Sequence, residues 1–341
     1  MRSLVVEQRR GFAVEGRHEI DAVACDASGR ITALVGEDAV TTFRSAAKPF
    51  QLEESLAALD PALRARLSSE DLAIGAASHH GEAMHVQQVA QLLSKLDRNP
   101  AHLYCGAHAP SHAASAQALY AAGAEPSVLH NNCSGKHSFM AAACATQGWD
   151  ANYLAPTHPL QQRILTRMNE RAGGSVQGVE IDGCGLPCFV LPLSGMARAW
   201  AQVAVAMTMT MGGVGGVGGG GSAQAGDESL GAIGRAMHQH PLLMSGSEAF
   251  DGWLTQSTSA LAKVGAQGLL CAALPEQGLG LAIKIRSGAD AVRPVAAWTL
   301  LREWFASTMG EELPERFSAV KNVVGKAVGD VHASWLTRPA N

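Results

Sequence analysis

The segment around residue 45 carries a serine and a lysine with the spacing of a Ser-x-x-Lys motif. Ser45 and Lys48 are three residues apart, so in a helical turn their side chains lie on one face. A lysine can remove the proton of a serine hydroxyl when burial and a neighbouring cation, such as Arg44, lower its pKa. A helix that begins here would also direct backbone N–H groups toward a developing negative charge. Alone, the motif equally fits a capping serine followed by a solvated lysine.

Three further polar clusters contain glycine and stand at the ends of predicted elements, where functional residues tend to lie. They are Ser-His-His-Gly-Glu at 78–82, His-Asn-Asn-Cys-Ser-Gly-Lys-His at 130–137 and Asp-Gly-Cys-Gly-Leu-Pro at 182–187. None of them has the composition of a hydrophobic core. We therefore expect these clusters to meet the Ser-x-x-Lys segment in one site.

Two cysteines in these clusters raise the question of a metal. Cys133 and Lys136 have i, i+3 spacing, and Cys184 follows about fifty residues later. Two thiolates can bind Zn²⁺, and a neutral lysine amine or a histidine could be the third protein ligand, with water in the fourth place. The spacing alone favours buried free thiols, because structural zinc sites usually show closely paired cysteines.

Composition limits the class of protein. The chain has 341 residues, 47% hydrophobic and 16% charged, which is enough for one large domain or two lobes. A net charge of -4 without any Lys/Arg-rich block disfavours a nucleic-acid or membrane surface and favours a small-molecule partner. The first residues have no signal-peptide pattern, no long apolar run predicts a membrane helix, and the seven cysteines are scattered. We therefore expect a cytoplasmic protein with free thiols.

The order of predicted elements favours an α+β fold, in which helices pack on an antiparallel sheet that could join both ends of the chain. Strands are predicted at 4–6, 12–14, 22–24, 31–35, 179–182, 189–193, 268–274 and 279–285, and the apolar run 72–77 is typical of a strand. Helices are predicted at about 49–59, 81–95, 113–122, 135–147, 158–171, 194–211, 291–309 and 315–324. Eight glycines in residues 212–221 predict a flexible loop, read as a linker.

Taken together, the motifs resemble the Rhizobium-type asparaginase family, also called asparaginase II or class 3. The resemblance covers about residues 5–330 and is carried by five segments in the same order. They are Arg-Ser-Ala-Ala-Lys-Pro at 44–49, Ala-Ser-His-His-Gly-Glu at 77–82, the clusters at 130–137 and 182–187, and Cys-Ala-Ala-Leu-Pro at 271–275.

The resemblance implies a single catalytic domain over 1–341 with a fold similar to serine β-lactamases and serine glutaminases. It implies hydrolysis of L-asparagine to L-aspartate and ammonia by a homodimer. Two Ser-Lys pairs are implied, Ser45 with Lys48 and Ser78 with Lys263. The implied ligands of a Zn²⁺ ion are Cys133, Lys136 and Cys184, and the implied substrate-binding residues are Arg44, His79, Asn132, Gly135 and Asp182.

One mechanism follows as a hypothesis. A lysine deprotonates Ser45 or Ser78, the serine attacks the amide carbon, ammonia leaves, and water cleaves the acyl-enzyme. Ser45 is preferred as nucleophile because its base would lie in the same helical turn, and the metal would orient the substrate. A penicillin-recognising amidase or serine glutaminase is the alternative, although Lys-Thr-Gly and Ser-Asp-Asn motifs are missing from the sequence. A non-catalytic module that binds a metal or an amino acid is the second alternative.

Overall fold

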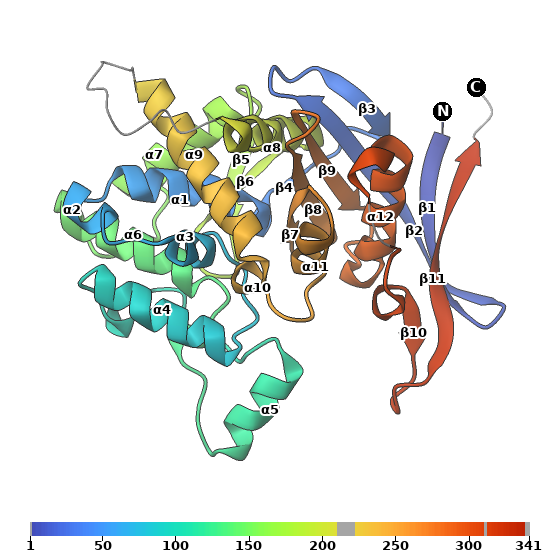
Figure 1. The fold of residues 1–341 in the computed structure, drawn as a ribbon, viewed down its shortest axis with the longest axis horizontal. Coiled ribbons are helices and arrows are strands. Elements are labelled where there is room, and N and C mark those ends of the chain that lie inside the picture. Colours follow the sequence, from blue (N-terminus) through green and yellow to red (C-terminus); the bar gives the residue numbers. More distant parts are fainter. Residues whose placement is uncertain (1, 210–221, 310–311, 338–341) are drawn as a thin grey trace.

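The larger sheet of this computed structural model has eight strands and is antiparallel throughout (Figure 1). The structure describes residues 2–209, 222–309 and 312–337, so the predicted loop at 212–221 lies outside the described residues. The strands, in spatial order, are β10 (Ala319–Lys321), β11 (Ala327–Thr337), β1 (Arg2–Arg10), β2 (Ala13–Asp26), β9 (Leu279–Ile285), β8 (Leu269–Leu274) and β7 (Leu261–Gly265), and β3 (Ile31–Val35) also pairs with β2.

Both ends of the chain contribute to this sheet, as the sequence predicted. β1 pairs with β11 over seven residue positions, from Arg2 opposite Thr337 to Gln8 opposite Val331. The predicted hairpin near the end of the chain is also present, because β8 pairs with β9 from Leu269 to Leu274. The α+β prediction is therefore confirmed.

A smaller sheet of three strands holds two of the segments predicted to form the site. It contains β4 (Val40–Thr42), β6 (Pro187–Pro192) and β5 (Gly178–Ile181), in that order. Residues 182–186, which include Cys184, form the connection between β5 and β6. The Phe43 N–H donates to Phe189 O at 2.8 Å, so the start of the Ser-x-x-Lys segment is attached to the same sheet.

Helices cover both faces of the large sheet. Along β2, Val23 and Cys25 belong to one hydrophobic cluster, whereas Ala22 and Ala24 belong to another, as expected when alternate side chains point to opposite faces. Helix α8 (Leu193–Thr208) packs in the first cluster and α12 (Arg293–Trp304) in the second. The remaining helices are α1 (Lys48–Ala57), α2 (Pro61–Arg64), α3 (Ser69–Gly75), α4 (Ala83–Lys95), α5 (Ala113–Ala121), α6 (Ser134–Gln147), α7 (Pro159–Arg171), α9 (Ser222–Gln239), α10 (Pro241–Met244) and α11 (Phe250–Ser257).

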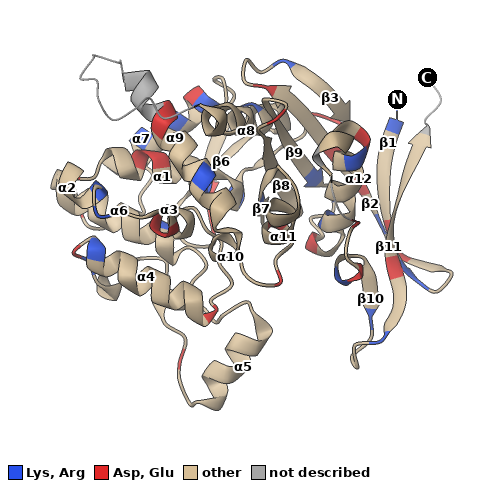
Figure 2. Cartoon of the chain, viewed as in Figure 1, with Lys and Arg blue, Asp and Glu red and all other residues tan. Residues whose placement is uncertain are grey.

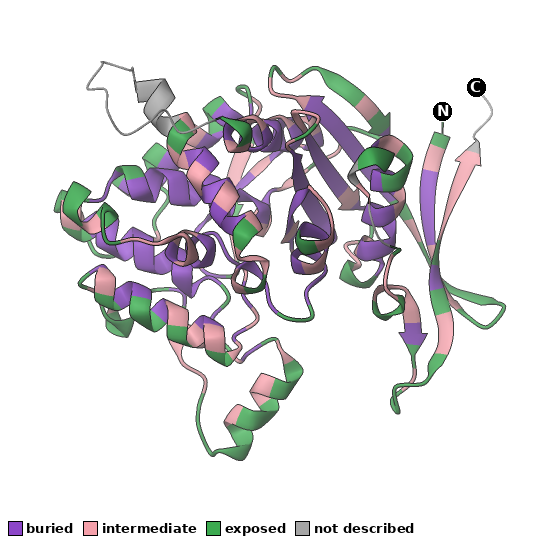
Figure 3. Cartoon of the chain, in the orientation of Figure 1, coloured by how far each residue is buried: buried purple, intermediate pink, exposed green. Residues whose placement is uncertain are grey.

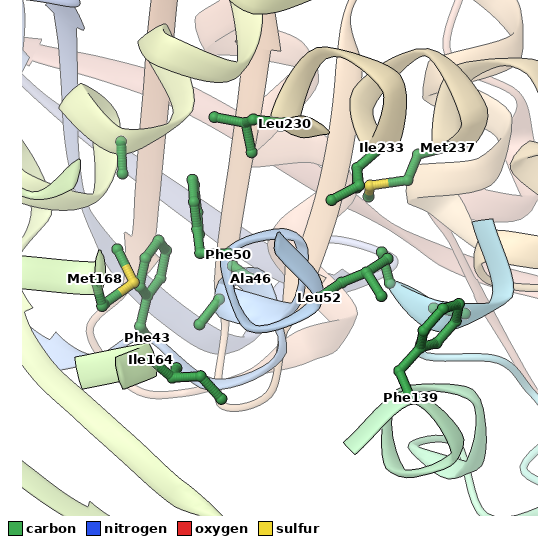
Figure 4. Packing of buried hydrophobic residues seen from close by; sticks show 14 of the residues in the cluster. Phe43, Ala46, Phe50, Leu52, Phe139, Ile164, Met168, Leu230, Ile233 and Met237 are labelled. Atoms are coloured by element: carbon green, nitrogen blue, oxygen red, sulfur yellow. The ribbon is translucent and has the colours of Figure 1, made fainter. Parts of the chain in front are cut away.

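Helix α1 lies in the middle of the helical half, and nine of its ten residues are buried (Figure 3). Phe50 and Leu52 extend from it to different sides: Phe50 packs against Phe43 and the Trp200 ring of α8, and Leu52 lies on the side of Phe139 of α6 (Figure 4). Ion pairs add to this packing: Glu54 accepts from Arg167 at 2.9 Å, and Glu53 accepts from Arg171 at 2.6 Å. Figure 2 shows where acidic and basic residues lie along the helices. Lys48, the first residue of α1, is therefore held on a rigid element.

Two predicted elements are of the wrong type, and the two strands predicted at 12–14 and 22–24 form one strand, β2. The apolar run 72–77 belongs to helix α3, which begins at a capping box of Ser68 and Asp71 and not at a strand. A short apolar run does not distinguish a strand from a buried helix. The helix predicted at 315–324 is a single 3₁₀ turn, Glu315–Phe317, followed by β10. The predicted helices that became α1, α4, α5, α6, α7, α8 and α12 are confirmed, with ends that differ by up to a few residues.

Candidate active site

Ser45 lies on the wall of a cavity of about 180 Å³. It belongs to a short 3₁₀ helix, Arg44–Ala47, that runs directly into α1. Four further segments reach the same cavity from distant parts of the sequence. The other lining residues are Arg44, His108, Asn131, Asn132, Cys133, Asp182, Gly183, Cys184 and Ala266. The fold thus brings the Ser-x-x-Lys segment together with the clusters at 130–137 and 182–187, as predicted.

Arg44 and Asp182 form an ion pair at this cavity. Arg44 Nε donates to Asp182 Oδ1 at 2.8 Å, and both side chains are mostly buried. Burial alone would raise the pKa of Asp182, but Lys136, the Gly183 N–H and Arg44 together lower it. Arg44 has a φ of +45°, a left-handed conformation that is uncommon outside glycine and is often found at functional sites.

Lys48 makes a direct hydrogen bond with the second predicted serine. Its Nζ lies 2.8 Å from Ser78 Oγ, and it also donates to the carbonyl oxygens of Ala77 at 2.6 Å and Asn132 at 3.2 Å. The side chain is completely buried, and burial lowers the pKa of Lys48. Nζ donates all three of these bonds, which matches the three N–H groups of an ammonium; loss of one proton would leave a lone pair that could accept from the Ser78 hydroxyl.

The structure therefore joins the Lys48 side chain to Ser78. Among the described residues, Lys48 is bonded to Ser45 only through the backbone, from the Lys48 N–H to the Ser45 carbonyl oxygen, and not through the two side chains. The implied pairs, Ser45 with Lys48 and Ser78 with Lys263, thus differ from the observed hydrogen bonds. The reason is geometric. Ser78 follows α3 at a point where the Ala77 carbonyl and the Ser78 hydroxyl both reach the end of the lysine side chain.

Lys263, on β7, is also completely buried, but its partner is a carboxylate that the sequence did not suggest. Its Nζ donates to Asp251 Oδ2 at 3.3 Å and to Val264 O at 3.2 Å. Burial lowers the pKa of Lys263 to about 8, although the negative charge of Asp251 opposes this effect. Asp251 belongs to no recognisable motif, so its proximity to Lys263 could be found only from the fold.

The three predicted metal ligands meet beside the cavity. Lys136 Nζ lies 3.6 Å from Cys184 Sγ, and Cys133, Lys136 and Cys184 are all buried. A hydrogen bond from Cys184, helped by Lys48 and Lys136, lowers the pKa of Cys133 well below its usual value, and the same bond raises the pKa of Cys184. Burial would lower the pKa of Lys136, but the charges of Cys184, Cys133 and Asp182 raise it.

Two sulfur atoms and one amine suit the preference of zinc for soft ligands, so these residues fit the implied ion. Both cysteines are free, so they are available as ligands. Among the described residues, no group of three or more His, Cys, Asp or Glu side chains has the arrangement of a metal site. The candidate site therefore depends on Lys136 as its third ligand.

One known protein family matches nearly the whole chain. The family model for L-asparaginase II matches residues 6–333. The chain belongs to the L-asparaginase II family. No curated protein sequence matches it.

Solved structures with a similar fold are distant from this L-asparaginase II family member. A structure of Mglu in its native form has 16% identity and a TM-score of 0.44, over 87% of this chain and 63% of that chain. A β-lactamase from Mycobacterium bovis has 17% identity and a TM-score of 0.39, over 83% of this chain and 94% of that one. Within the described residues, no helix is both long enough and apolar enough to span a membrane.

Two of the substrate-binding residues predicted for this L-asparaginase II family member, His79 and Gly135, do not line the cavity. His79 is completely buried, with Nε2 2.8 Å from Ser134 Oγ and Nδ1 accepting from the Gly81 N–H. A Cβ atom on Gly135 would lie 2.0 Å from Ile74 O, so this glycine permits close packing of α6 on α3. Their contact with substrate stays a prediction, whereas Arg44, Asn132 and Asp182 do line the cavity.

Proposed function

We propose that this L-asparaginase II family member hydrolyses the side-chain amide of L-asparagine, giving L-aspartate and ammonia, through a serine activated by a buried lysine. The observation that carries the proposal is the hydrogen bond of 2.8 Å between Lys48 Nζ and Ser78 Oγ. A lysine amine with a pKa lowered by burial is a suitable base for a serine hydroxyl at neutral pH.

The cavity supports a small amino acid as the substrate. Arg44 uses Nε to bind Asp182, which leaves its terminal N–H groups to donate to the α-carboxylate of a substrate. The carboxylate of Asp182 can accept from the substrate α-ammonium group. A cavity of about 180 Å³ with one cation and one anion at its wall favours a compact zwitterion over a large apolar ligand.

Ser45 is our choice for the nucleophile, because it lines the cavity and Ser78 is not among the lining residues. Lys48, through its bond to Ser78, is our choice for the group that receives the proton. The Ser45 oxygen forms a bond to the amide carbon while its proton passes by way of the Ser78 hydroxyl to Lys48, the C–N bond breaks, and Lys48 gives the proton to the nitrogen that leaves as ammonia. Water then hydrolyses the ester, and the first backbone N–H groups of α6 are suited to stabilise the oxyanion.

A zinc ion, where present, would be held by Cys133, Lys136 and Cys184. It would supply positive charge that orients a substrate oxygen, and two thiolates would weaken its acidity. We therefore expect that removal of metal by a chelator raises KM for asparagine more than it lowers kcat. The family resemblance also favours a homodimer in the cytoplasm.

Ammonia release by four proteins tests this function: the unchanged enzyme and the variants Ser45→Ala, Ser78→Ala and Ser55→Ala. Ser55 is a buried serine of the same helix as Lys48, and its hydroxyl bonds only to Gln51 O, so it is the matched control. We expect the first two variants to lose at least about 1,000-fold in kcat and the control to stay within about twofold. Full activity of both site variants would contradict the proposal.

The choice of substrate is tested by a panel of L-asparagine, L-glutamine and a β-lactam. Fastest release of product from asparagine is the expected result. Preference for glutamine or for the β-lactam would favour the alternative amidases. Asparagine binding by calorimetry without any ammonia release would favour the non-catalytic module.

A further inference from the structure

Asp251 is a buried carboxylate that the proposed mechanism does not use, and it is paired with Lys263. Asp251 is the second residue of α11 and is completely buried. A charge at such a position is costly unless it is compensated. The surroundings of Asp251 therefore have to explain why it is there.

Three bonds fix Asp251 between two elements. Its Oδ1 accepts from the Gly252 N–H at 3.1 Å within α11, and its Oδ2 accepts from the Val264 N–H at 3.0 Å on β7. The same Oδ2 is 3.3 Å from Lys263 Nζ. One backbone N–H group holds each oxygen atom of the carboxylate. Its orientation is therefore fixed independently of Lys263.

The other charged or titratable groups that face Lys263 come from several elements. Lys48 on α1 and Arg293 on α12 are cations that disfavour a second positive charge, and Asp251 is the anion that favours it. His80, in the loop after α3, senses the charges of both Asp251 and Lys263. The charge of Asp251 therefore stabilises the ammonium form of Lys263, and the charges of Lys48 and Arg293 destabilise it.

We propose that Asp251 is a positioning residue that keeps the Lys263 ammonium charged and fixed on β7, the strand that contacts the Arg44–Ala47 turn carrying Ser45. The inference rests on the proposed function, because the charge of Lys263 would act in the proposed hydrolysis. A fixed positive charge in a buried site stabilises negative charge that develops on a serine oxygen or on a tetrahedral intermediate. Without the carboxylate, burial would favour the neutral amine, and the side chain would lose the partner that orients it.

The test is Asp251→Asn, which keeps the size of the side chain and removes its charge. If a charged Lys263 is required, the activity of the unchanged enzyme falls as the pH rises through about 8, the pKa of Lys263. Removal of the anion lowers this pKa, so the alkaline loss of activity moves to lower pH by at least about one unit. At pH 7 we expect kcat to fall by about 100-fold, with KM for asparagine changed less than about threefold.

Asp71→Asn is the matched control. Asp71 is also a completely buried carboxylate near the start of a helix and bonded to a lysine, but that lysine is Lys95, which has no place in the proposed site. Its variant should lose stability without any shift of the alkaline limb. An Asp251→Asn variant that keeps both kcat and the alkaline limb of the unchanged enzyme would overturn the inference.

A second variant covers the case in which Asp251→Asn does not fold. Lys263→Arg carries a charge that persists at high pH, so the alkaline loss near pH 8 should disappear while part of kcat remains. Persistence of that loss in the arginine variant would also overturn the inference.

Direct titration separates this inference from the proposed function. The ¹³Cε signal of Lys263 in lysine-labelled enzyme, assigned with Lys263→Arg, reports the charge of the side chain without any substrate. Absence of ammonia release would refute the function, and the Lys263 titration in Asp251→Asn would still test the pairing. An unchanged titration of Lys263 in that variant would refute the role of Asp251 alone.

Discussion

Three buried lysines belong to the predicted site, and the side chain of each has a different bonding partner. Lys48 has a serine and two carbonyl groups, Lys263 has a carboxylate, and Lys136 has a cysteine sulfur. Burial lowers the pKa of Lys48 and Lys263, whereas nearby thiols and Asp182 raise the pKa of Lys136. One residue type thus serves as a base, as a fixed charge and as a candidate ligand, because the environments separate the pKa values.

The same burial has a consequence for stability. The pKa of Lys263 is about 8 in the folded protein and about 10.4 in an unfolded chain. Between these values the unfolded state binds more protons, so the free energy of unfolding rises with pH in this window. Below pH 8 the ammonium of Lys263 costs folding free energy, and above about pH 10 that cost is absent.

At the residue scale, Arg44→Lys tests the binding of substrate. A lysine cannot bind Asp182 and a substrate carboxylate at once with the fork of a guanidinium. We expect KM for asparagine to rise at least about tenfold, with kcat lowered much less, in steady-state measurements of ammonia release. Unchanged KM in Arg44→Lys would show that this arginine does not hold the substrate.

The sequence could predict the residues of the cavity that belong to motifs, but not His108 and Ala266, which also line it, and not the partners of the lysines. Arg44, Ser45, Cys133 and Cys184 belong to local motifs that carry their own signal, and all four line the cavity. Asp251 stands in a segment without a motif, and its lysine comes twelve residues later on a different element. The bond between Lys48 and Ser78 likewise depends on where α3 ends against α1.

At the element scale, the junction of α3 and α6 controls the position of two site segments. Ser78 follows α3, and Cys133 immediately precedes α6. Gly135 lets the two helices approach so closely that an added Cβ would meet the backbone carbonyl of Ile74. The spacing between the predicted base and the predicted metal ligands therefore depends on a residue with no functional group.

Gly135→Ala should accordingly destabilise the protein by at least about 2 kcal/mol, because a helix has to move to make room for the methyl group. Gly178→Ala is the control, since a Cβ there would be 3.8 Å from Val190 Cβ, and it should change stability by less than about 0.5 kcal/mol. Urea unfolding followed by circular dichroism measures both. Equal stability of the two variants would contradict the packing argument.

The type of an element was predictable where the periodic pattern of hydrophobic residues extended over a long segment. The amphipathic segments of α4 and α7 gave correct helices, because thirteen residues show the period clearly. Helix α3 has seven residues and an uninterrupted apolar run, so its period was hidden. The weak alternation in β11 gave no strand signal, because most of its described side chains are only half-buried.

At the scale of the whole molecule, β11 completes the large sheet. It contributes Val331 to the second hydrophobic cluster, and it is the antiparallel partner of β1 along most of that strand. An enzyme that stops after residue 326 should lose cooperative thermal unfolding, because β1 loses its partner on one side. An enzyme that stops after residue 337 is the control and should unfold as a single transition. A cooperative transition in the shorter protein would contradict this prediction.

The pairing of β1 with β11 also has a consequence for biosynthesis. β1 leaves the ribosome before β11, and about 320 further residues are translated before its partner is available. Throughout that interval the edge of β1 offers unpaired peptide groups to any neighbouring nascent chain. For this reason, slow translation or crowding on polysomes should favour aggregation, and a chaperone that shields the amino-terminal hairpin should raise the yield of active enzyme.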